Sequence, residues 1–411
     1  MEIGTISQLS DTGLDRRLLR MIMLHAGNPR VTLRLWDGRE FSVSPGEPVA
    51  CIEFRKRRAI FELLASPSVG FGECYSKGLI EIHGDFLALA NEITTAFTRQ
   101  RDRGYWWHKF RSLLVSIRAN SLTRSRHNVH HHYDLGNDFY RLWLDERMLY
   151  TCAYYESAGA SLAEAQVAKL DHVCRKLRLE PGQTVIEAGC GWGALAMHMA
   201  ERYGVSVKAY NNSHEQVAYA KQQASLKGLE EQVEFVLDDY RTINQKCDVF
   251  VSVGMLEHVG LRNYKKLGDI INHCLKPNGL ALIHSIGRSH SRPADPWITK
   301  HIFPGGYIPS LGDMAALFEP HKFSVLDIEN LRLHYARTCA DWLENFEAVS
   351  EQVVEMYSEE FARTWRLYLA GSSAGFQSGT LQLYQVLFAP GGNNDVPWTR
   401  QYQFEPRSGT N

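Results

Sequence analysis

The sequence of 411 residues lacks several features that would narrow its function at once. No apolar run approaches the ~18 residues of a membrane-spanning helix, so any contact with a membrane is expected at its surface. The 8 cysteines form no CxxC pair, which argues against a zinc ribbon and a disulfide framework. No secretory signal peptide opens the chain, so we expect a cytoplasmic protein. The net charge of -1 gives the whole chain no electrostatic preference for nucleic acid.

What is present is ordinary for a globular protein with two or three domains, at 44% hydrophobic and 22% charged residues. We divide the chain into residues 1–100, 101–127 and 128–411. In the first part, two alternating segments, 31–36 and 40–43, flank Asp37-Gly38 and predict a β-hairpin. We expect a small α+β domain there, which serves as a structural or oligomerising unit or docks on lipid.

Residues 99–127 form a basic segment in which aromatic residues are interleaved with the charges. This composition is typical of a helix that lies on an anionic bilayer, although a solvated linker or an RNA-binding segment would use the same residue types. We favour the membrane surface and expect no nucleic-acid partner. The basic residues are Arg99, Arg101, Arg103, Lys109, Arg111, Arg118, Arg124 and Arg126, and the aromatic ones are Tyr105, Trp106, Trp107 and Phe110.

A run of histidines, His127 and 130–132, follows this segment. Adjacent side chains cannot all face one ion, and no cysteine or carboxylate stands at ligand spacing. We therefore predict no metal site.

The most informative stretch is a β-branched run that ends in three glycines at alternate positions, Gly189, Gly191 and Gly193, before an apolar helical segment. Glycines let the backbone approach a ligand closely, although a glycine-rich turn without a ligand would look the same. Strands and helices then alternate to about residue 286, which predicts a doubly wound parallel sheet with ligands beyond the carboxyl ends of its strands. Residues 341–370 are expected to be helical, and residues 381–388 to form a late strand at the edge of the sheet.

The pattern G-x-G-x-G after Glu187 resembles motif I of the S-adenosylmethionine (SAM) methyltransferases, which have a Rossmann-like sheet with added helices. Further segments resemble the cyclopropane-fatty-acyl-phospholipid synthase family, which includes the mycolic acid cyclopropane synthases. Several motifs in one order make a chance match very unlikely. They lie at residues 132–140, 149–154, 255–260, 284–287 and 302–306, with a helical segment around Tyr335 and Trp342.

The resemblance implies SAM as cofactor and assigns residues to its site. Thr151 replaces the family's usual serine and keeps the hydroxyl, and Asn211 stands where the family has threonine. Asp239 and Tyr240 are candidates for the adenine, although Tyr240 could be a plain core aromatic. The full set is Tyr133, Tyr150, Thr151, Glu187, Gly189, Gly191, Asn211, Ser213, Gln216, Asp239 and Tyr240.

Methyl transfer to an isolated double bond leaves a carbocation on the acyl chain, which must be kept from water until a base removes a proton. In the resembled family the base is a bound bicarbonate ion, held by a cage of polar groups. By motif, that cage here consists of Cys152, Glu257, His284 and Tyr335 with the backbone of Ile286. Cys152 could instead be a small apolar residue, His284 a core histidine, and Tyr335 one aromatic among many.

The resemblance therefore implies an enzyme that forms cyclopropane rings on unsaturated acyl chains of membrane phospholipids, and we expect it to act from the inner face of the membrane. A methyl- or methylene-branched product is an alternative, and so is a non-catalytic SAM-binding protein that docks on lipid or RNA. The oligomeric state stays open, and a homodimer is one option.

Overall fold

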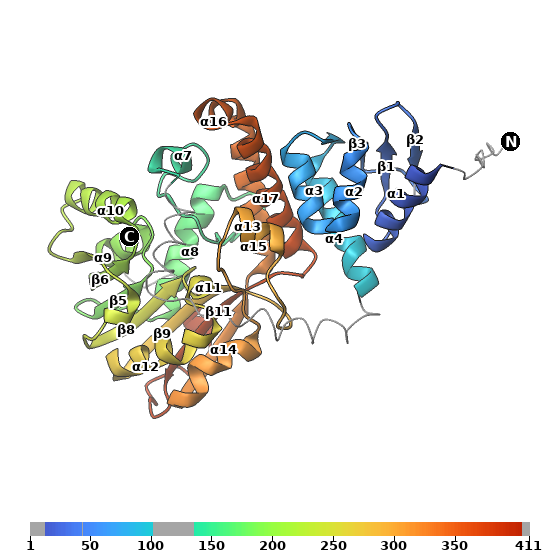
Figure 1. Cartoon of the computed structure of the whole chain (residues 1–411). Coiled ribbons are helices and arrows are strands. Elements are labelled where there is room, and N and C mark those ends of the chain that lie inside the picture. The colour runs from blue at the N-terminus through green and yellow to red at the C-terminus, as the bar shows by residue number, and fades with distance from the viewer. Residues whose placement is uncertain (1–12, 43, 102–134, 405–411) are drawn as a thin grey trace.

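The computed structural model describes residues 13–42, 44–101 and 135–404, which form two sheets with their helices (Figure 1). The histidine run, Tyr133 and nearly all of the basic segment lie outside the described residues. Within the described residues, the helices are too short or too polar to cross a bilayer.

The N-terminal unit is a four-stranded sheet in the order β2-β1-β3-β4, packed with four helices. The predicted hairpin is confirmed, because Leu33 of β1 pairs with Phe41 of β2 in antiparallel register. The strand at residues 50–54 and the helices at residues 14–25 and 67–76 were not predicted. The elements are α1 (Leu14–His25), β1 (Val31–Arg34), β2 (Glu40–Ser42), β3 (Ala50–Phe54), α2 (Arg58–Ala65), α3 (Pro67–Ser76), β4 (Ile80–Gly84) and α4 (Phe86–Arg101).

The larger sheet has seven strands in the order β10-β11-β9-β8-β5-β6-β7. Strands β9, β8, β5, β6 and β7 are parallel, as the alternation of strands and helices predicted. The strands are β5 (Thr184–Ala188), β6 (Ser206–Asn211), β7 (Val233–Leu237), β8 (Cys247–Val253), β9 (Leu275–Gly287), β10 (Phe323–Asn330) and β11 (Gln382–Pro390).

Helices cover both faces of this sheet, so each central strand is apolar at consecutive positions. Val185 of β5 packs toward α8, α9 and α10, whereas the next residue, Ile186, packs toward α12 and α14. The helices are α7 (Asn137–Arg141), α8 (Leu162–Lys176), α9 (Ala194–Tyr203), α10 (His214–Leu226), α11 (Leu256–Val259), α12 (Tyr264–Cys274), α13 (Pro296–His301), α14 (Leu311–Phe318), α15 (Arg332–Ala348), α16 (Ser350–Met356) and α17 (Glu359–Gln377).

The prediction that the last strand lies at the sheet edge is wrong. β11 is antiparallel to β9 on one side and to β10 on the other, so β10 is the edge strand. β10 alternates between more and less exposed residues and carries a register shift between Val325 and Asp327, so its apolar pattern is weak. β11 is buried on both faces, so its apolar pattern predicts a strand. The pattern does not reveal which strands lie on either side of it.

The two units meet along α17, which runs beside α3 and α4 (Figure 1). Arg363 of α17 donates both to the carboxylate of Glu81, at 3.0 Å, and to backbone oxygens of Tyr75 and Ile80. Where α3 meets α13, a Cβ at Gly72 would lie 2.1 Å from the Trp297 ring, so only glycine permits this approach. The N-terminal unit is thereby fixed against the side of the larger domain.

Candidate active site

A single cavity of about 800 Å³ lies beyond the carboxyl ends of the parallel strands and continues to the N-terminal unit. At one end the glycine loop lines it, and further along Glu257, Ile286 and Tyr335 do so. Its far end is lined by apolar side chains of the N-terminal unit. The N-terminal side chains there include Ile52, Phe54, Leu63, Phe71, Ile93 and Phe97.

The glycine loop between β5 and α9 has a backbone conformation that favours glycine at three positions. Gly189, Gly191 and Gly193 all have positive φ, at 85°, 54° and 86°. A Cβ on Gly191 would meet nothing within 4 Å, whereas one on Gly193 would lie 2.6 Å from the Phe235 ring. Gly191 therefore leaves room on the cavity side, and Gly193 allows α9 to pack closely on its neighbours.

The residues after β6 tie the loop to the second strand. Asn211 lines the cavity, and its side-chain amide donates to the Gly191 carbonyl, at 3.1 Å, and to Gln216 Oε1, at 2.8 Å. Ser213 does not line the cavity, since its hydroxyl accepts from the Gln216 backbone and caps α10. Of the three predicted cofactor residues here, the structure brings Asn211 and Gln216 to the cavity.

After β7, Tyr240 lines the cavity but its predicted partner does not. The Asp239 carboxylate faces Arg241, whose Nε lies 2.7 Å from Asp239 Oδ1, and it also caps a short 3-10 turn. Asp238, which the sequence analysis did not select, lines the cavity instead. The sequence alone cannot tell which of two adjacent acids points into the cavity, because that depends on the course of the backbone.

Tyr150 and Thr151 line the cavity as predicted. The Tyr150 hydroxyl lies 2.7 Å from the Tyr368 hydroxyl, and Thr151 Oγ1 accepts a hydrogen bond from Lys169 Nζ at 2.8 Å. Lys169 also lines the cavity and was missed. A signal existed, because its spacing from Ala165, Leu170 and other apolar residues of α8 puts the lysine on the buried face.

Glu187 lies near the end of β5, just before the glycine loop, and lines the cavity. It is buried, and its Oε2 atom has no hydrogen-bond partner in the described residues. Burial raises the pKa of this carboxyl to about 8, although the charge of Lys169 acts in the opposite direction. A carboxyl in this state can bind a cation that enters the cavity, because the cation restores the stabilisation that water no longer supplies.

Glu257 begins α11 directly after β8, where its side chain enters the cavity wall. Its Oε1 atom accepts from the backbone N–H of Ile286 at 2.6 Å, while Oε2 has no partner in the described residues. Burial raises the pKa of Glu257 to about 7, against the backbone hydrogen bonds that lower it. Near neutral pH the carboxyl therefore exists in both protonation states, which suits proton exchange and hydrogen bonding to an anion.

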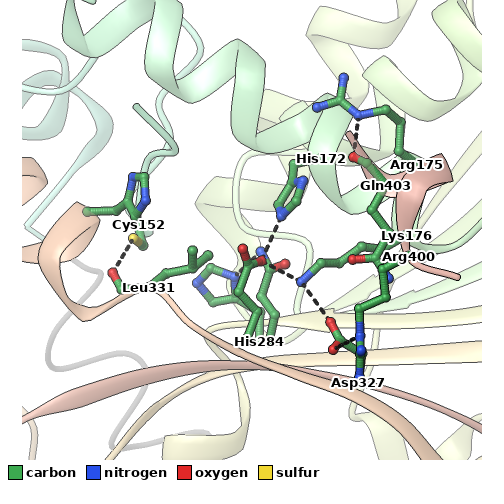
Figure 2. Close-up of polar contacts among 12 residues, drawn as sticks. Cys152, His172, Arg175, Lys176, His284, Asp327, Leu331, Arg400 and Gln403 are labelled. Atoms are coloured by element: carbon green, nitrogen blue, oxygen red, sulfur yellow. Dashed lines mark hydrogen bonds and ion pairs between the residues drawn. The ribbon is translucent and has the colours of Figure 1, made fainter. Parts of the chain in front are cut away.

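Tyr335 lines the same stretch of the cavity from α15, and burial keeps its pKa well above the ordinary value. Cys152 and Glu257 lie close enough to add to this shift. Cys152 itself is fully buried and does not line the cavity. Its thiol lies 3.2 Å from the backbone oxygen of Ala153. It also lies 3.9 Å from that of Leu331, a contact that Figure 2 shows.

His284 is also buried and does not line the cavity. Its Nδ1 atom lies 3.1 Å from Gln385 Nε2 on the neighbouring strand, and its Nε2 atom has no partner in the described residues. Burial first, then the positive charges of Lys169 and Lys176, lower its pKa well below the ordinary value, so the ring is neutral. Of the five predicted cage residues, Glu257, Ile286 and Tyr335 meet at the cavity, and the other two lie behind its wall.

The described residues contain no group of three His, Cys, Asp or Glu side chains that could hold a metal ion.

Comparisons with known proteins agree with this geometry. Residues 120–386 match the family model for mycolic acid cyclopropane synthetase, and residues 18–102 match a domain of unknown function. The chain is 38% identical to cyclopropane-fatty-acyl-phospholipid synthase of Escherichia coli, over 81% of this chain and 86% of that protein. It is 34% identical to a probable fatty acid methyltransferase of Pseudomonas putida, over 90% of this chain and 95% of that protein.

A solved structure of mycolic acid cyclopropane synthase CmaA1, complexed with SAH and CTAB, superposes with a TM-score of 0.61 at 31% identity. It covers 64% of this chain, and 97% of that chain is matched. The family model spans more than half of the present chain, and the nearly full-length relatives exceed 30% identity. This protein belongs to the mycolic acid cyclopropane synthetase family and is a SAM-dependent methyltransferase.

Proposed function

We propose that the protein adds the methyl carbon of SAM to the cis double bond of unsaturated phospholipid acyl chains and closes a cyclopropane ring. The single observation that carries this proposal is the cavity, which joins the glycine loop to Glu257 and Tyr335 and then continues between apolar side chains into the N-terminal unit. Small polar methyl acceptors need no such passage, whereas an acyl chain does.

The residues at the glycine-loop end fit SAM. Gly191 leaves open space where a ligand can lie against the backbone, and the unpartnered oxygen of Glu187 suits a cationic group. Tyr150, Thr151, Asn211, Gln216 and Tyr240 line the same end.

The residues around Glu257 fit a small anion. The unpartnered Oε2 atom can donate to an anion when Glu257 is protonated, and the Tyr335 hydroxyl stays protonated at any physiological pH. When bound, SAM supplies the methyl carbon and bicarbonate supplies the base that accepts its proton. The apolar walls exclude water from positive charge on the acyl chain, and the Tyr335 ring can face that charge. Cys152 and His284 support this region from behind.

We extend the proposal to the membrane. The N-terminal unit, about residues 1–100, would deliver lipid to the cavity that it helps to line, and residues 101–127 would lie on the cytoplasmic face of an anionic membrane. The cavity walls contributed by Ile52 and Phe54 support a lipid-related role for this unit over a purely structural one.

The test incubates the full chain with SAM and vesicles of cis-unsaturated phospholipid, followed by mass spectrometry of the released fatty esters. We expect esters heavier by one CH₂ that resist hydrogenation, and none from vesicles of saturated phospholipid. A methyl- or methylene-branched ester would instead support the alternative product. SAM binding without any transfer to lipid would contradict the proposal.

Glu257→Gln tests the assigned chemistry. The amide keeps the size of the side chain but cannot exchange a proton, so we expect turnover to fall about 10²-fold or more while SAM affinity changes little. The control is Glu234→Gln on β7, an exposed position that does not line the cavity. Equal loss of binding and turnover in Glu257→Gln would count against a role in the transfer step.

A further inference from the structure

Lys169 is a buried lysine that no predicted role includes. It lies on α8 with 1% of its surface exposed, and it lines the cavity, as Thr151 and the glycine loop do. In the described residues, Thr151 Oγ1 is its hydrogen-bond partner, at 2.8 Å, and no carboxylate lies within ion-pair distance. An ammonium has three donors, so the ligand-free protein leaves most of this group's capacity unused.

A lysine in such a position is costly to keep charged. Burial lowers its pKa to about 8, although Asp145, Cys152 and Glu187 act to raise it. Asp145 does not neutralise the lysine directly, because its two oxygens accept from the backbone N–H groups of Leu149 and Arg147. An anion arriving in the cavity would remove much of the cost.

Glu187 faces the same cavity and has the opposite requirement. Its carboxyl is buried, Oε2 has no partner in the described residues, and no ion pair joins it to Lys169. The cavity wall at the glycine-loop end thus contains a buried lysine and a buried carboxyl, and no ion pair joins either of them to another described residue. This arrangement is complementary to a zwitterion.

We infer that Lys169 binds the carboxylate of the methionine end of SAM, while Glu187 faces the ammonium of the same group. The inference rests on the proposed use of SAM and adds a residue that determines which sulfonium ligands the site accepts. Thr151 joins in, because its Oγ1 accepts from Lys169 and its own hydroxyl hydrogen remains able to donate to the carboxylate. Lys169 is then a ligand-binding residue, and α8 belongs to the cofactor site.

The test compares SAM with decarboxylated SAM, which lacks only the carboxylate, by isothermal titration calorimetry on the full chain. We expect the wild type to bind SAM about 100-fold more tightly than the decarboxylated form, since the truncated ligand leaves a buried charge unpaired. Lys169→Met should weaken SAM binding about 100-fold and leave the decarboxylated form nearly unchanged, so that the preference disappears.

Lys176→Met is the matched control. Lys176 lies on the same helix and is equally buried, but it pairs with Glu329 and does not line the cavity. This variant should lose stability and keep the preference for SAM. If Lys169→Met does not fold, Thr151→Val provides the second test and should reduce the preference by a smaller factor.

Equal weakening of both ligands in Lys169→Met would overturn the inference, because it would mean a structural role. Unchanged SAM affinity with a lost response to added bicarbonate would also overturn it and assign Lys169 to the other anion. If the wild type binds no SAM, the proposed function fails together with this inference. If the wild type modifies vesicles and Lys169→Met binds SAM as tightly as the wild type does, only this inference fails.

Discussion

Lys169 and Lys176 occupy one face of α8, two helical turns apart, and both are almost fully buried. Their surroundings differ completely. Lys176 Nζ lies 2.6 Å from Glu329 Oε2, and His172 Nε2 lies 2.7 Å from the same oxygen. Figure 2 shows Lys176, His172 and Asp327 grouped on one side of His284, with Arg400 reaching Asp327 from outside. The hydrogen-bond partner of Lys169 Nζ is instead the hydroxyl of Thr151, which carries no charge.

The difference separates structural charge from functional charge. A buried charge that the protein itself neutralises stabilises the fold only while its partner is present. A buried charge left without a counter-ion beside a cavity stores binding capacity for a ligand. The paired cluster of Lys176, His172 and Glu329 joins α8 to the edge strand β10, whereas Lys169, Glu187 and Glu257 face the space where the reaction is proposed to occur.

The largest expected effect comes from breaking the paired cluster. Glu329→Gln removes the nearer of the two carboxylates that pair with the buried Lys176 and leaves only Asp327 Oδ2, at 3.9 Å, as its counter-ion. We expect the free energy of unfolding to fall by about 3 kcal/mol at pH 7, measured in urea. Burial alone would raise the pKa of Glu329, but the His172 hydrogen bond and the Lys176 charge outweigh it and lower the pKa to about 2.

The pH dependence provides the control for that variant. The stabilisation from Glu329 is present above the unfolded pKa of 4.5 and is lost as the pH falls through about 2. Wild type and Glu329→Gln should therefore converge in stability toward pH 2. A difference below about 1 kcal/mol at pH 7 would mean that the cluster is not a structural unit.

On the cavity side, an uncharged replacement should stabilise the protein. The pKa of Glu257 is raised from 4.5 to about 7, so the folded protein binds this proton more strongly than the unfolded chain does. The contribution of Glu257 to stability therefore falls as the pH rises from 4.5 to 7 and is level above that. Glu257→Gln should gain about 1–3 kcal/mol at pH 8 and nothing at pH 4.5, in unfolding experiments without bicarbonate. Destabilisation at pH 8 would contradict the assignment of an unpaired carboxyl.

The smallest effect on stability, with a large effect on binding, is expected in the glycine loop. Gly191→Val places a side chain in open space at a positive φ, so it should cost about 1 kcal/mol of stability while SAM binding falls below detection. In Gly193→Ala the new Cβ would clash with the Phe235 ring, so we expect the main effect of this variant to be a loss of stability. Calorimetry and urea unfolding of both variants separate the two outcomes, and normal SAM affinity in Gly191→Val would exclude the loop as the cofactor site.

Much of the larger domain could be predicted from local pattern. The strand before Gly189, the capped start of α10 at Ser213 and the alternation of parallel strands all depend on neighbouring residues, and all are found. The edge strand β10 was missed because half of its side chains face solvent and a register shift interrupts its pattern. Motif similarity selected Cys152 and His284, but it could not tell a residue in the wall from one behind it.

The sequence by itself determined the glycine loop, the acid that precedes it and the membership of a methyltransferase family, because these depend on residues close together in the chain. Only the tertiary structure decided that the N-terminal unit lines the cavity and that Lys176 has a counter-ion where Lys169 has none. The physical reason is distance along the chain. The carboxylate that neutralises Lys176 lies 153 residues away on β10, and no local pattern records which buried charge the fold provides with a partner.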